Sequence, residues 1–433
     1  MDTPTTQRPL TGQDARTLAL AALGGALEFY DFIIFVFFTA VIGQLFFPKD
    51  TSEWLRQLMS FGLFAAAYLA RPLGGIIMAH HGDRSGRKRM FTLSVFMMAV
   101  PTLLIGALPT HATAGYAAPL ALLGLRILQG AAVGGEVPGA WVFVSEHVPE
   151  RRVGFACGTL TAGLTFGILL GSLVATAINT RYTPEEVLAF AWRIPFVVGG
   201  VFGFFSVFLR RWLAETPVFE EMRQRRALVA ELPLKAVLRG HGLAVGVSML
   251  LTWVLTAGIV VVILMTPTLM QKLHGISPAR ALEANSLATL SLTFGCVAYG
   301  LAADRFGPGR VLGGGCVALL GVTYLLYQGV AEDPGRLVPL SMLAGACVGV
   351  VGVVPTVMVH AFPAEVRFSG LSFSYNVAYA ISGSLTPVVV PLLVVRTPLA
   401  PAHYVAGVCL VGLGVSLYLV SAGRARFARM GGA

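Results

Sequence analysis

The chain has 433 residues, of which 56% are hydrophobic and only 12% are charged, and its formal net charge is +10 at pH 7. A soluble domain carries about 25% charged residues, so this composition excludes an ordinary water-soluble globular protein and predicts a surface that faces lipid. The basic residues lie in loops between apolar runs, a distribution that favours attraction to a membrane surface over nucleic-acid binding.

Apolar runs of the length that a bilayer requires recur along the whole chain. A helix needs about 20 apolar residues to cross the hydrocarbon layer, and membrane helices tolerate the Gly and Pro found here. Residues 1–16 are polar, and the first apolar run is too long for a cleavable signal, so we expect no signal peptide. The predicted spans are 17–42, 57–80, 90–108, 118–146, 153–178, 191–213, 243–270, 284–303, 311–330, 337–362, 369–393 and 401–422.

The basic residues between these spans predict the orientation. The even-numbered loops and the two tails together hold most of the 31 Lys and Arg residues, and the odd-numbered loops hold few. Cytoplasmic loops of membrane proteins carry the excess of Lys and Arg, so both termini are expected to be cytoplasmic.

Two motifs recur in the second part of the chain. Asp83-Arg84-Ser85-Gly86 returns as Asp304-Arg305-Phe306-Gly307, and Pro149-Glu150-Arg151 returns in the neighbourhood of Pro363. A duplication at nearly constant offset predicts a transporter built from two bundles. The predicted organisation is a cytoplasmic tail (1–16), a six-helix bundle (17–213), a cytoplasmic linker (214–241), a second six-helix bundle (242–422) and a cytoplasmic tail (423–433).

Five ionisable residues fall deep inside predicted spans, and all five belong to the first half. Such residues are costly in a membrane and mark functional sites by default. The second half can offer only neutral groups, such as Trp253, Tyr299, Tyr375, Asn376 and Tyr379. The five ionisable residues are Glu28, Asp31, Arg71, Arg126 and Glu136.

The acids suggest proton coupling. Glu28 and Asp31 are three residues apart and share a helix face, and Asp31 lies about 21 Å along its span, near the middle of the membrane. Two carboxylates so close in a low dielectric resist being ionised together, so one is expected to hold a proton near neutral pH. We predict proton coupling through Asp31, Glu28 and Glu136. The alternative is a permanent ion pair with an arginine that holds helices together.

The arginines suggest an anion site. An Arg side chain can bind a carboxylate through two parallel hydrogen bonds, and it keeps its charge when buried. The alternative is an internal ion pair with one of the three acids. Tyr375 and Asn376 share a helix face with Tyr379, which helix packing also explains. The predicted substrate-binding residues are Arg71, Arg126, Gln129, Tyr375 and Asn376.

The loop Asp83-Arg84-Ser85-Gly86-Arg87-Lys88 resembles the signature loop of the major facilitator superfamily, with Ala79 where that family usually has Gly. The runs 126–136, Phe29-Tyr30-Asp31-Phe32, 71–74 and 192–196 are similar to its metabolite:proton symporter branch. The resemblance implies an all-α integral membrane fold of twelve transmembrane helices in two pseudo-symmetric six-helix bundles. It also implies a cytoplasmic gate made of Asp83, Arg84, Arg87, Glu146, Glu150, Arg151, Asp304 and Arg305.

This resemblance implies a proton-coupled symporter in the cell inner membrane that imports a small carboxylate-bearing metabolite by alternating access. Two interior arginines suit a ligand with more than one negative charge, and the short segment after the last span cannot form the coiled coil of many osmolyte carriers. We therefore predict a di- or tricarboxylate such as citrate. The alternatives are a proline/betaine-type osmolyte symporter, an exporter of drugs or siderophores, and a membrane receptor that does not transport.

The sequence indicates neither an enzyme nor a cofactor site. Phosphate-loop, serine-hydrolase and zinc-protease motifs are missing from the sequence, and the five cysteines lack metal-ligand spacing. His80 and His81 beside Asp83 are better explained as a wetted helix end than as a metal site. The expected partners are a small organic anion, protons and the lipid bilayer, without nucleic acid, for a monomeric carrier.

Overall fold

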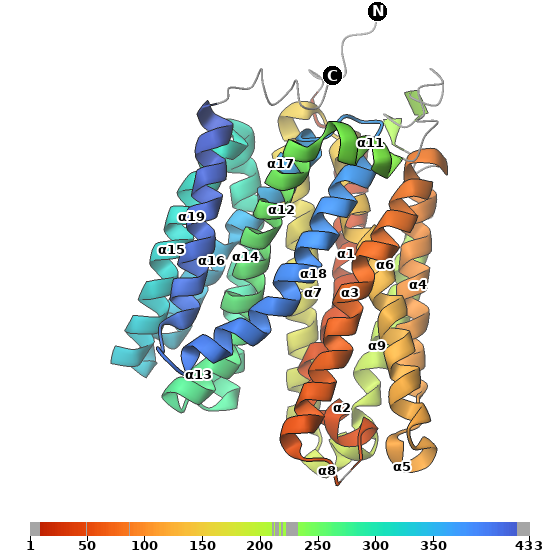
Figure 1. Ribbon diagram of the computed structural model, residues 1–433, viewed down its shortest axis with the longest axis vertical. Helices are drawn as coiled ribbons and strands as arrows, with labels where there is room; N and C mark the ends of the chain where they lie inside the picture. Colours follow the sequence, from red (N-terminus) through yellow and green to blue (C-terminus); the bar gives the residue numbers. More distant parts are fainter. Residues whose placement is uncertain are drawn as a thin grey trace, which may run out of the picture.

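The computed structural model describes residues 9–48, 50–85, 87–209, 212, 216–217, 220–221 and 233–421, and the side chains at 53–54, 57–58, 61, 64, 82–88, 91, 233 and 278 lie outside this description. The described chain is helical almost throughout and contains no strand (Figure 1). The all-α fold class predicted from the sequence is confirmed.

The first half consists of long helices joined by short ones. Its elements are α1 (Gly12–Phe37), α2 (Thr39–Phe46), α3 (Glu53–Ser85), α4 (Arg87–Ala107), α5 (His111–Ala114), α6 (Ala117–His147), a 3-10 turn (Glu150–Arg152), α7 (Val153–Arg181), α8 (Pro184–Glu186), a π-helical turn (Val187–Ala191) and α9 (Arg193–Leu209).

The second half follows the same plan. Its elements are α11 (Pro233–Gly240), α12 (Gly242–Thr256), a π-helical segment (Ala257–Met265), α13 (Thr266–His274), α14 (Pro278–Phe306), α15 (Pro308–Glu332), a 3-10 turn (Pro334–Arg336), α16 (Leu337–Val348), a 3-10 turn (Gly349–Gly352), α17 (Val354–His360), α18 (Arg367–Val394) and α19 (Ala400–Ser421).

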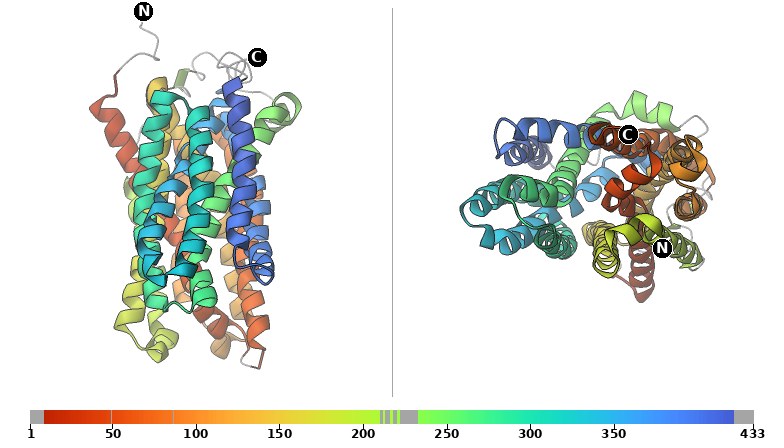
Figure 2. Two further views of the ribbon diagram at one scale, coloured as in Figure 1. Left: turned by 90° about the vertical axis from the view of Figure 1, so that its left-hand side faces the viewer. Right: turned by 90° about the horizontal axis from the view of Figure 1, so that it is seen from below.

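These elements match the predicted spans. Within the described residues, nine helices are long and apolar enough to cross a membrane, and the bent pair Pro184–Ala191 and Arg193–Leu209 supplies a tenth span. The two other predicted spans correspond to α3 and α4. The chain is therefore a multi-pass membrane protein, with α1 beginning and α19 ending at the same end of the bundle (Figure 2). We call this end the termini side and the opposite end the far side.

The structure interrupts several spans that the sequence presents as continuous, among them 337–362 at the 3-10 turn Gly349–Gly352. The predicted span 17–42 breaks at Phe38, which separates α1 from α2 with φ −105° and ψ 10°. The predicted span 243–270 contains a π-helical segment of nine residues, Ala257–Met265. π-Helical turns often occur at functional sites, and hydropathy cannot reveal either irregularity because both segments stay apolar.

Local capping fixes several helix ends. Thr11 and Asp14 form a capping box at the start of α1, where the Thr11 hydroxyl accepts from the Asp14 amide at 3.2 Å. Gly275 ends α13 with φ +63°, a left-handed conformation that glycine adopts without steric cost. Ser277 then caps α14 by accepting a hydrogen bond from the Arg280 amide at 3.4 Å.

The two halves meet along α7 and α14 and along α3 and α18. The hydroxyl pairs Ser172–Ser286 and Thr165–Thr293 join α7 to α14, each at 3.1 Å. A side chain at Gly300 would collide with the backbone carbonyl of Gly154, so α7 and α14 approach closely near the termini side. In Figure 1, α3 and α18 lie together at their upper ends and separate toward the far side.

Candidate functional site

Glycines position the central arginine. A side chain at Gly130 would collide with the backbone carbonyl of Ala67, and one at Gly134 would collide with that of Arg71. These two glycines stand one helical turn apart on α6 and therefore let α3 pack backbone to backbone against it. This contact fixes the height and rotation of Arg71 in the bundle, where its residue is only 1% exposed.

The guanidinium of Arg71 lies among three tyrosine rings from both halves. Its central carbon is 5.5 Å from the ring centroid of Tyr68, 5.1 Å from that of Tyr375 and 4.3 Å from that of Tyr379. Tyr68 and Tyr379 stack face to face across the interface between α3 and α18, with centroids 5.4 Å apart. Aromatic faces attract a buried cation, so this cluster stabilises the charge without neutralising it. We call Arg71, Tyr68, Tyr375 and Tyr379 the Arg71 cluster.

Asn376 ties the Arg71 cluster to the helix interface. Its side-chain oxygen accepts a hydrogen bond from Arg71 Nε at 3.3 Å. Its amide nitrogen donates to the Gly134 carbonyl at 2.6 Å and to the Ser372 carbonyl at 2.8 Å. One amide therefore connects α3, α6 and α18, and it holds the arginine in a single orientation.

A pocket between the halves adjoins this cluster. Tyr375 and Tyr379 form part of its lining, together with Trp141, whose ring meets Tyr375 edge to face at 5.0 Å. The Trp141 indole donates a hydrogen bond to the Thr161 hydroxyl at 3.2 Å. The remaining lining is largely apolar and consists of Phe29, Leu164, Thr165, Ile168, Leu255, Ile259 and Val351. Leu255 and Ile259 flank the start of the π-helical segment.

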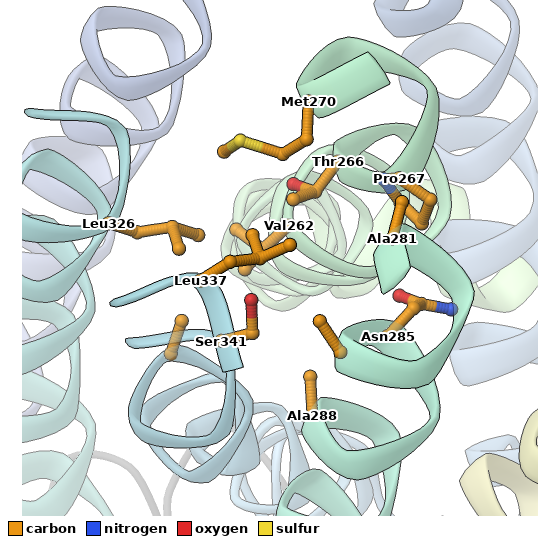
Figure 3. Close-up of a pocket in the computed structure, with 12 residues that line it drawn as sticks. Val262, Thr266, Pro267, Met270, Ala281, Asn285, Ala288, Leu326, Leu337 and Ser341 are labelled. Atoms are coloured by element: carbon orange, nitrogen blue, oxygen red, sulfur yellow. The ribbon is translucent and has the colours of Figure 1, made fainter. Parts of the chain in front are cut away.

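Another pocket lies wholly inside the second half, between α13, α14, α15 and α16 (Figure 3). Thr266, Asn285 and Ser341 are its polar members, and apolar side chains such as Met270 and Leu326 complete the lining. None of its lining residues is charged, and it does not reach the Arg71 cluster. We therefore place the candidate site at the interface between the halves.

Arg126 forms the second buried cation. It is fully buried, and its central carbon lies 4.1 Å from the ring centroid of Phe35 and 5.1 Å from that of Phe32. Its Nη1 donates to Gln129 Oε1 at 2.9 Å, and Gln129 Nε2 donates in turn to the Thr102 hydroxyl at 2.8 Å. Arg126 is thus oriented by a series of side-chain hydrogen bonds that runs through Gln129 on α6 to Thr102 on α4.

Both guanidinium groups keep donors that no atom of the described residues accepts. In the described structure, Arg71 Nη2, Arg126 Nε and Arg126 Nη2 are buried and have no hydrogen-bond partner. Neither arginine forms an ion pair with a described carboxylate. The internal ion pairs that we considered from the sequence are therefore not formed in this conformation, and both cations stay available to an anion.

The acids of α1 point into the first half, away from the Arg71 cluster. Glu28 accepts a hydrogen bond from the Ser206 hydroxyl of α9 at 2.8 Å and is 1% exposed. Asp31 is fully buried, and its carboxylate packs against the bare backbone of Gly199 and Gly203 on the same helix. The two acids therefore share one side of α1, as predicted, and it is the side that faces α9.

Glu136 lies apart from the other two acids. It is 2% exposed and stands seven residues after Gln129 on α6, two turns nearer the termini side. The structure does not bring it beside Glu28 and Asp31.

Polar contacts join the two halves on the termini side. Glu146 Oε1 of α6 forms an ion pair at 3.0 Å with Arg367 Nη1 at the start of α18. The Asp304 carboxylate of α14 accepts from the backbone amides of Gly154 at 2.7 Å and Phe155 at 3.0 Å, at the N-terminus of α7. Backbone N–H groups at a helix N-terminus favour an acid there.

Other predicted gate residues have different surroundings. Glu150 and Arg151 are exposed on the 3-10 turn before α7, and Arg305 lies 5.3 Å from the ring of Phe306. The side chains of Asp83, Arg84 and Arg87 lie outside the described residues. Among the residues that the structure does describe, no three His, Cys, Asp or Glu side chains are grouped to hold a metal ion.

Sequence reasoning missed several residues that the structure places at these sites. Tyr68 stands three residues before Arg71 and could have been found as its neighbour on the helix face. Arg367 lies four residues after Pro363, in the segment that repeats Pro149-Glu150-Arg151, and the repeat alone does not indicate its partner. The neighbours of Asp31 on other helices, such as Thr102 and Gly199, carry no sequence signal, since neither is charged or part of a motif.

Residues 20–387 match the sequence profile of the Major Facilitator Superfamily, and the chain belongs to this superfamily and to its metabolite:proton symporter branch. It is 30% identical to a proline/betaine transporter of Salmonella typhimurium over 94% of this chain and 84% of that protein. It is also 30% identical to a citrate-proton symporter of Klebsiella pneumoniae, over 92% of this chain and 89% of that protein.

Solved structures show the same fold. The proton:xylose symporter XylE bound to 6-bromo-6-deoxy-D-glucose superposes with a TM-score of 0.80 at 16% identity, covering 94% of this chain and 95% of that one. The inward open conformation of XylE from E. coli superposes less well, with a TM-score of 0.65. The chain thus has the fold of proton-coupled symporters, and its relatives are transporters rather than enzymes.

Proposed function

We propose that this protein is a proton-coupled symporter that imports a small di- or tricarboxylate such as citrate. The observation that carries the proposal is the pair of buried arginines, Arg71 and Arg126, whose guanidinium groups retain hydrogen-bond donors without acceptors among the residues that the structure describes. The protein would act as a monomer in the cell inner membrane, with the termini side facing the cytoplasm.

The energetics support an anionic substrate. A buried cation without a partner costs several kcal/mol, because its solvation is lost and no carboxylate replaces it. Tyrosine rings offset only part of this cost, since a cation–π contact contributes about 0.5–2 kcal/mol. A ligand with two carboxylates would supply the missing acceptors to Arg71 and Arg126, and Gln129, Tyr375 and Asn376 would orient the complex.

We propose that the buried acids of the first half carry the coupled proton. Asp31 and Glu28 lie on the same side of α1 and are both buried, so a proton shared between them lowers the cost of their burial. We propose Asp31 as the main proton site, with Glu28 and Glu136 contributing.

Alternating access would come from the two halves, 17–213 and 242–422, rocking about the central site while 214–241 links them. The gate at the termini side would be built around Glu146 and Asp304, with Asp83, Arg84, Arg87, Glu150, Arg151 and Arg305 near the same end. Opening toward the cytoplasm requires the Glu146–Arg367 ion pair to break.

Uptake into sealed proteoliposomes tests the proposal. Labelled citrate, succinate and tricarballylate should accumulate when the lumen is more alkaline than the medium, and a protonophore should abolish the accumulation. Flux of this kind separates a carrier from a receptor, and a preference for inward over outward proton-driven movement separates an importer from an exporter. Binding of these acids without any flux would contradict the proposal.

The second candidate is a zwitterionic osmolyte such as proline or betaine. Trp141, Tyr375 and Tyr379 line the pocket, and aromatic faces of this kind bind quaternary ammonium groups. The similarity to a proline/betaine transporter points the same way. Uptake of betaine, but of none of the three acids, after an osmotic upshift would select this candidate over the first.

A further inference from the structure

Thr102 lies between the proton site and the buried arginine. It is fully buried on α4, and its hydroxyl donates to the Met98 carbonyl at 2.9 Å. The same hydroxyl accepts from Gln129 Nε2 at 2.8 Å, and Gln129 Oε1 holds Arg126 Nη1 at 2.9 Å. Thr102 is therefore the last member of the chain of side chains that orients Arg126.

Asp31 lies on the other side of Thr102. The ideal Cβ position of Gly199 lies 2.5 Å from Asp31 Oδ1 and 2.9 Å from the Thr102 methyl group, so a side chain at Gly199 would collide with both. The Thr102 side chain and the Asp31 carboxyl therefore meet at this point of α9, while the Thr102 hydroxyl donates its one proton to the Met98 carbonyl. Neither oxygen of Asp31 has a hydrogen-bond partner among the described residues.

We propose that the Thr102 hydroxyl is the positioning group through which the protonation of Asp31 controls Arg126. A hydroxyl has one proton and two lone pairs, so its direction depends on its neighbours. When Asp31 is ionised, the Thr102 proton turns from the Met98 carbonyl to the carboxylate, because a charge-assisted hydrogen bond is stronger. The polarised oxygen then holds the Gln129 amide more firmly, and Gln129 holds Arg126.

The opposite state follows when Asp31 binds a proton. The carboxyl group can now donate its own proton to the Thr102 oxygen, where it shares the acceptor with Gln129. The Gln129 amide is then held less firmly, so Arg126 can turn its donors toward a bound carboxylate. Protonation of Asp31 would in this way raise the affinity for the anion, which is the coupling that a symporter requires.

The surroundings of Asp31 leave few other routes for this coupling. On α1 the titratable neighbours are Glu28 and Tyr30, and Tyr30 donates its hydroxyl proton to the Pro195 carbonyl at 3.0 Å. The facing positions of α9 are glycines, and Ser206 is bonded to Glu28. Thr102 is the contact on α4, and Arg126 on α6 is reached through Gln129.

The test compares Thr102→Val with Thr102→Ser, with uptake measured at equal internal and external pH between pH 5.5 and 8. The KM of the wild-type protein for its substrate should change about fivefold or more across this range, at the lower end of typical coupling. Thr102→Val should show a KM that hardly depends on pH, with counterflow exchange retained. Thr102→Ser, which keeps the hydroxyl, should restore the pH dependence. Thr102→Ala provides a second hydroxyl-free variant if Val disturbs folding.

Thr323→Val is the matched control. Thr323 is also fully buried, and its hydroxyl donates to the backbone carbonyl of Leu319 at 2.7 Å, but it has no part in the Arg126 chain. In Thr323→Val, the KM should depend on pH as it does in the wild-type protein. A wild-type pH profile in both Thr102→Val and Thr102→Ala would overturn the inference, and so would an equal defect in Thr102→Ser and Thr102→Val.

The inference rests on the proposed symport, but the two can fail separately. If the wild-type protein carries betaine or proline instead of the three acids, the proposed substrate is wrong, and the Thr102 comparison is made with the osmolyte that it carries. A pH-independent Thr102→Val would still support the coupling role in that case.

Discussion

The two halves of this molecule share an architecture but differ in chemistry. In the described residues of the first half, Glu28, Asp31, Arg71, Arg126 and Glu136 are buried at membrane depth. In those of the second half, every buried polar side chain is neutral: serine, threonine or asparagine. The second half contributes aromatic rings, the Asn376 amide and much of the apolar pocket lining.

The difference shows how the two halves of a duplicated fold can take on different chemical roles. Charge in a membrane is costly, so concentrating it in one half lets the acids and arginines share a single polar network. The neutral half can then slide against Arg71 and Tyr68 without breaking a buried ion pair between the halves. Only the proposed gate pair Glu146–Arg367 joins opposite charges across the halves near the termini side in the described structure.

The largest effect is expected from Asp31→Asn, which tests whether the charge of the first half couples transport to protons. The amide cannot exchange a proton, so uphill accumulation under a pH gradient should fall by about 100-fold or more, while counterflow exchange persists. Uptake in proteoliposomes with and without a gradient measures both. Glu283→Gln, which neutralises an exposed acid of the second half, is the control and should leave accumulation unchanged. Gradient-driven accumulation by Asp31→Asn would show that the charge of the first half is not the coupling device.

Arg71→Lys should have the next largest effect. The ammonium keeps the charge but loses the planar, two-pronged geometry, so substrate affinity should fall about tenfold, or roughly 1.4 kcal/mol. Substrate-dependent thermal shifts and transport KM give the affinity. Arg396→Lys is the exposed control at the end of α18 and should bind normally. Unchanged affinity in the Arg71 variant would assign that residue to helix packing alone.

The gate pair tests the one charged contact between the halves. Arg367→Gln removes the cation from a pair whose Glu146 side chain is only 1% exposed, so transport should slow about fivefold as the closed gate is destabilised. The exchange of both partners, Glu146→Arg with Arg367→Glu, should recover much of the rate. Arg336→Gln is the control, because its ion pairs are exposed and contribute little. Equal transport rates in the wild-type protein, Arg367→Gln and Arg336→Gln would show that the Glu146–Arg367 pair is not part of the gate.

The smallest predicted effect concerns the aromatic contribution of the second half. Tyr379→Leu loses the ring face 4.3 Å from Arg71 and should weaken substrate binding about threefold to fivefold. Tyr379→Phe keeps the ring and should bind within about twofold of the wild-type protein, by the same argument. Binding measured by thermal shift compares the two, with Tyr418→Leu on α19 as the remote control. A Phe variant as weak as the Leu variant would indicate that the hydroxyl, rather than the ring, matters.

Much of the fold could be predicted from the sequence because its signals are local. Each span is long and apolar enough to be recognised by itself, and the recurrence of Asp83-Arg84 as Asp304-Arg305 indicates the duplication. The buried charges were also found this way, since Asp31 or Arg126 in an apolar run needs no partner to be noticed. The break at Phe38 and the π-helical segment 257–265 were missed because they change the backbone and not the hydropathy.

The sequence by itself determined that this chain spans a membrane many times and that its buried charge lies in the first half. Only the tertiary structure decided which way those charges point. Helix rotation is set by long-range packing. Gly130 and Gly134 let α3 pack closely against α6, and Gly199 and Gly203 leave room for the Asp31 carboxylate. These contacts place Asp31 against α9 and Thr102 and leave Arg71 among three tyrosines from both halves. A single sequence cannot reveal such pairings, because the energy of each contact depends on residues far away along the chain.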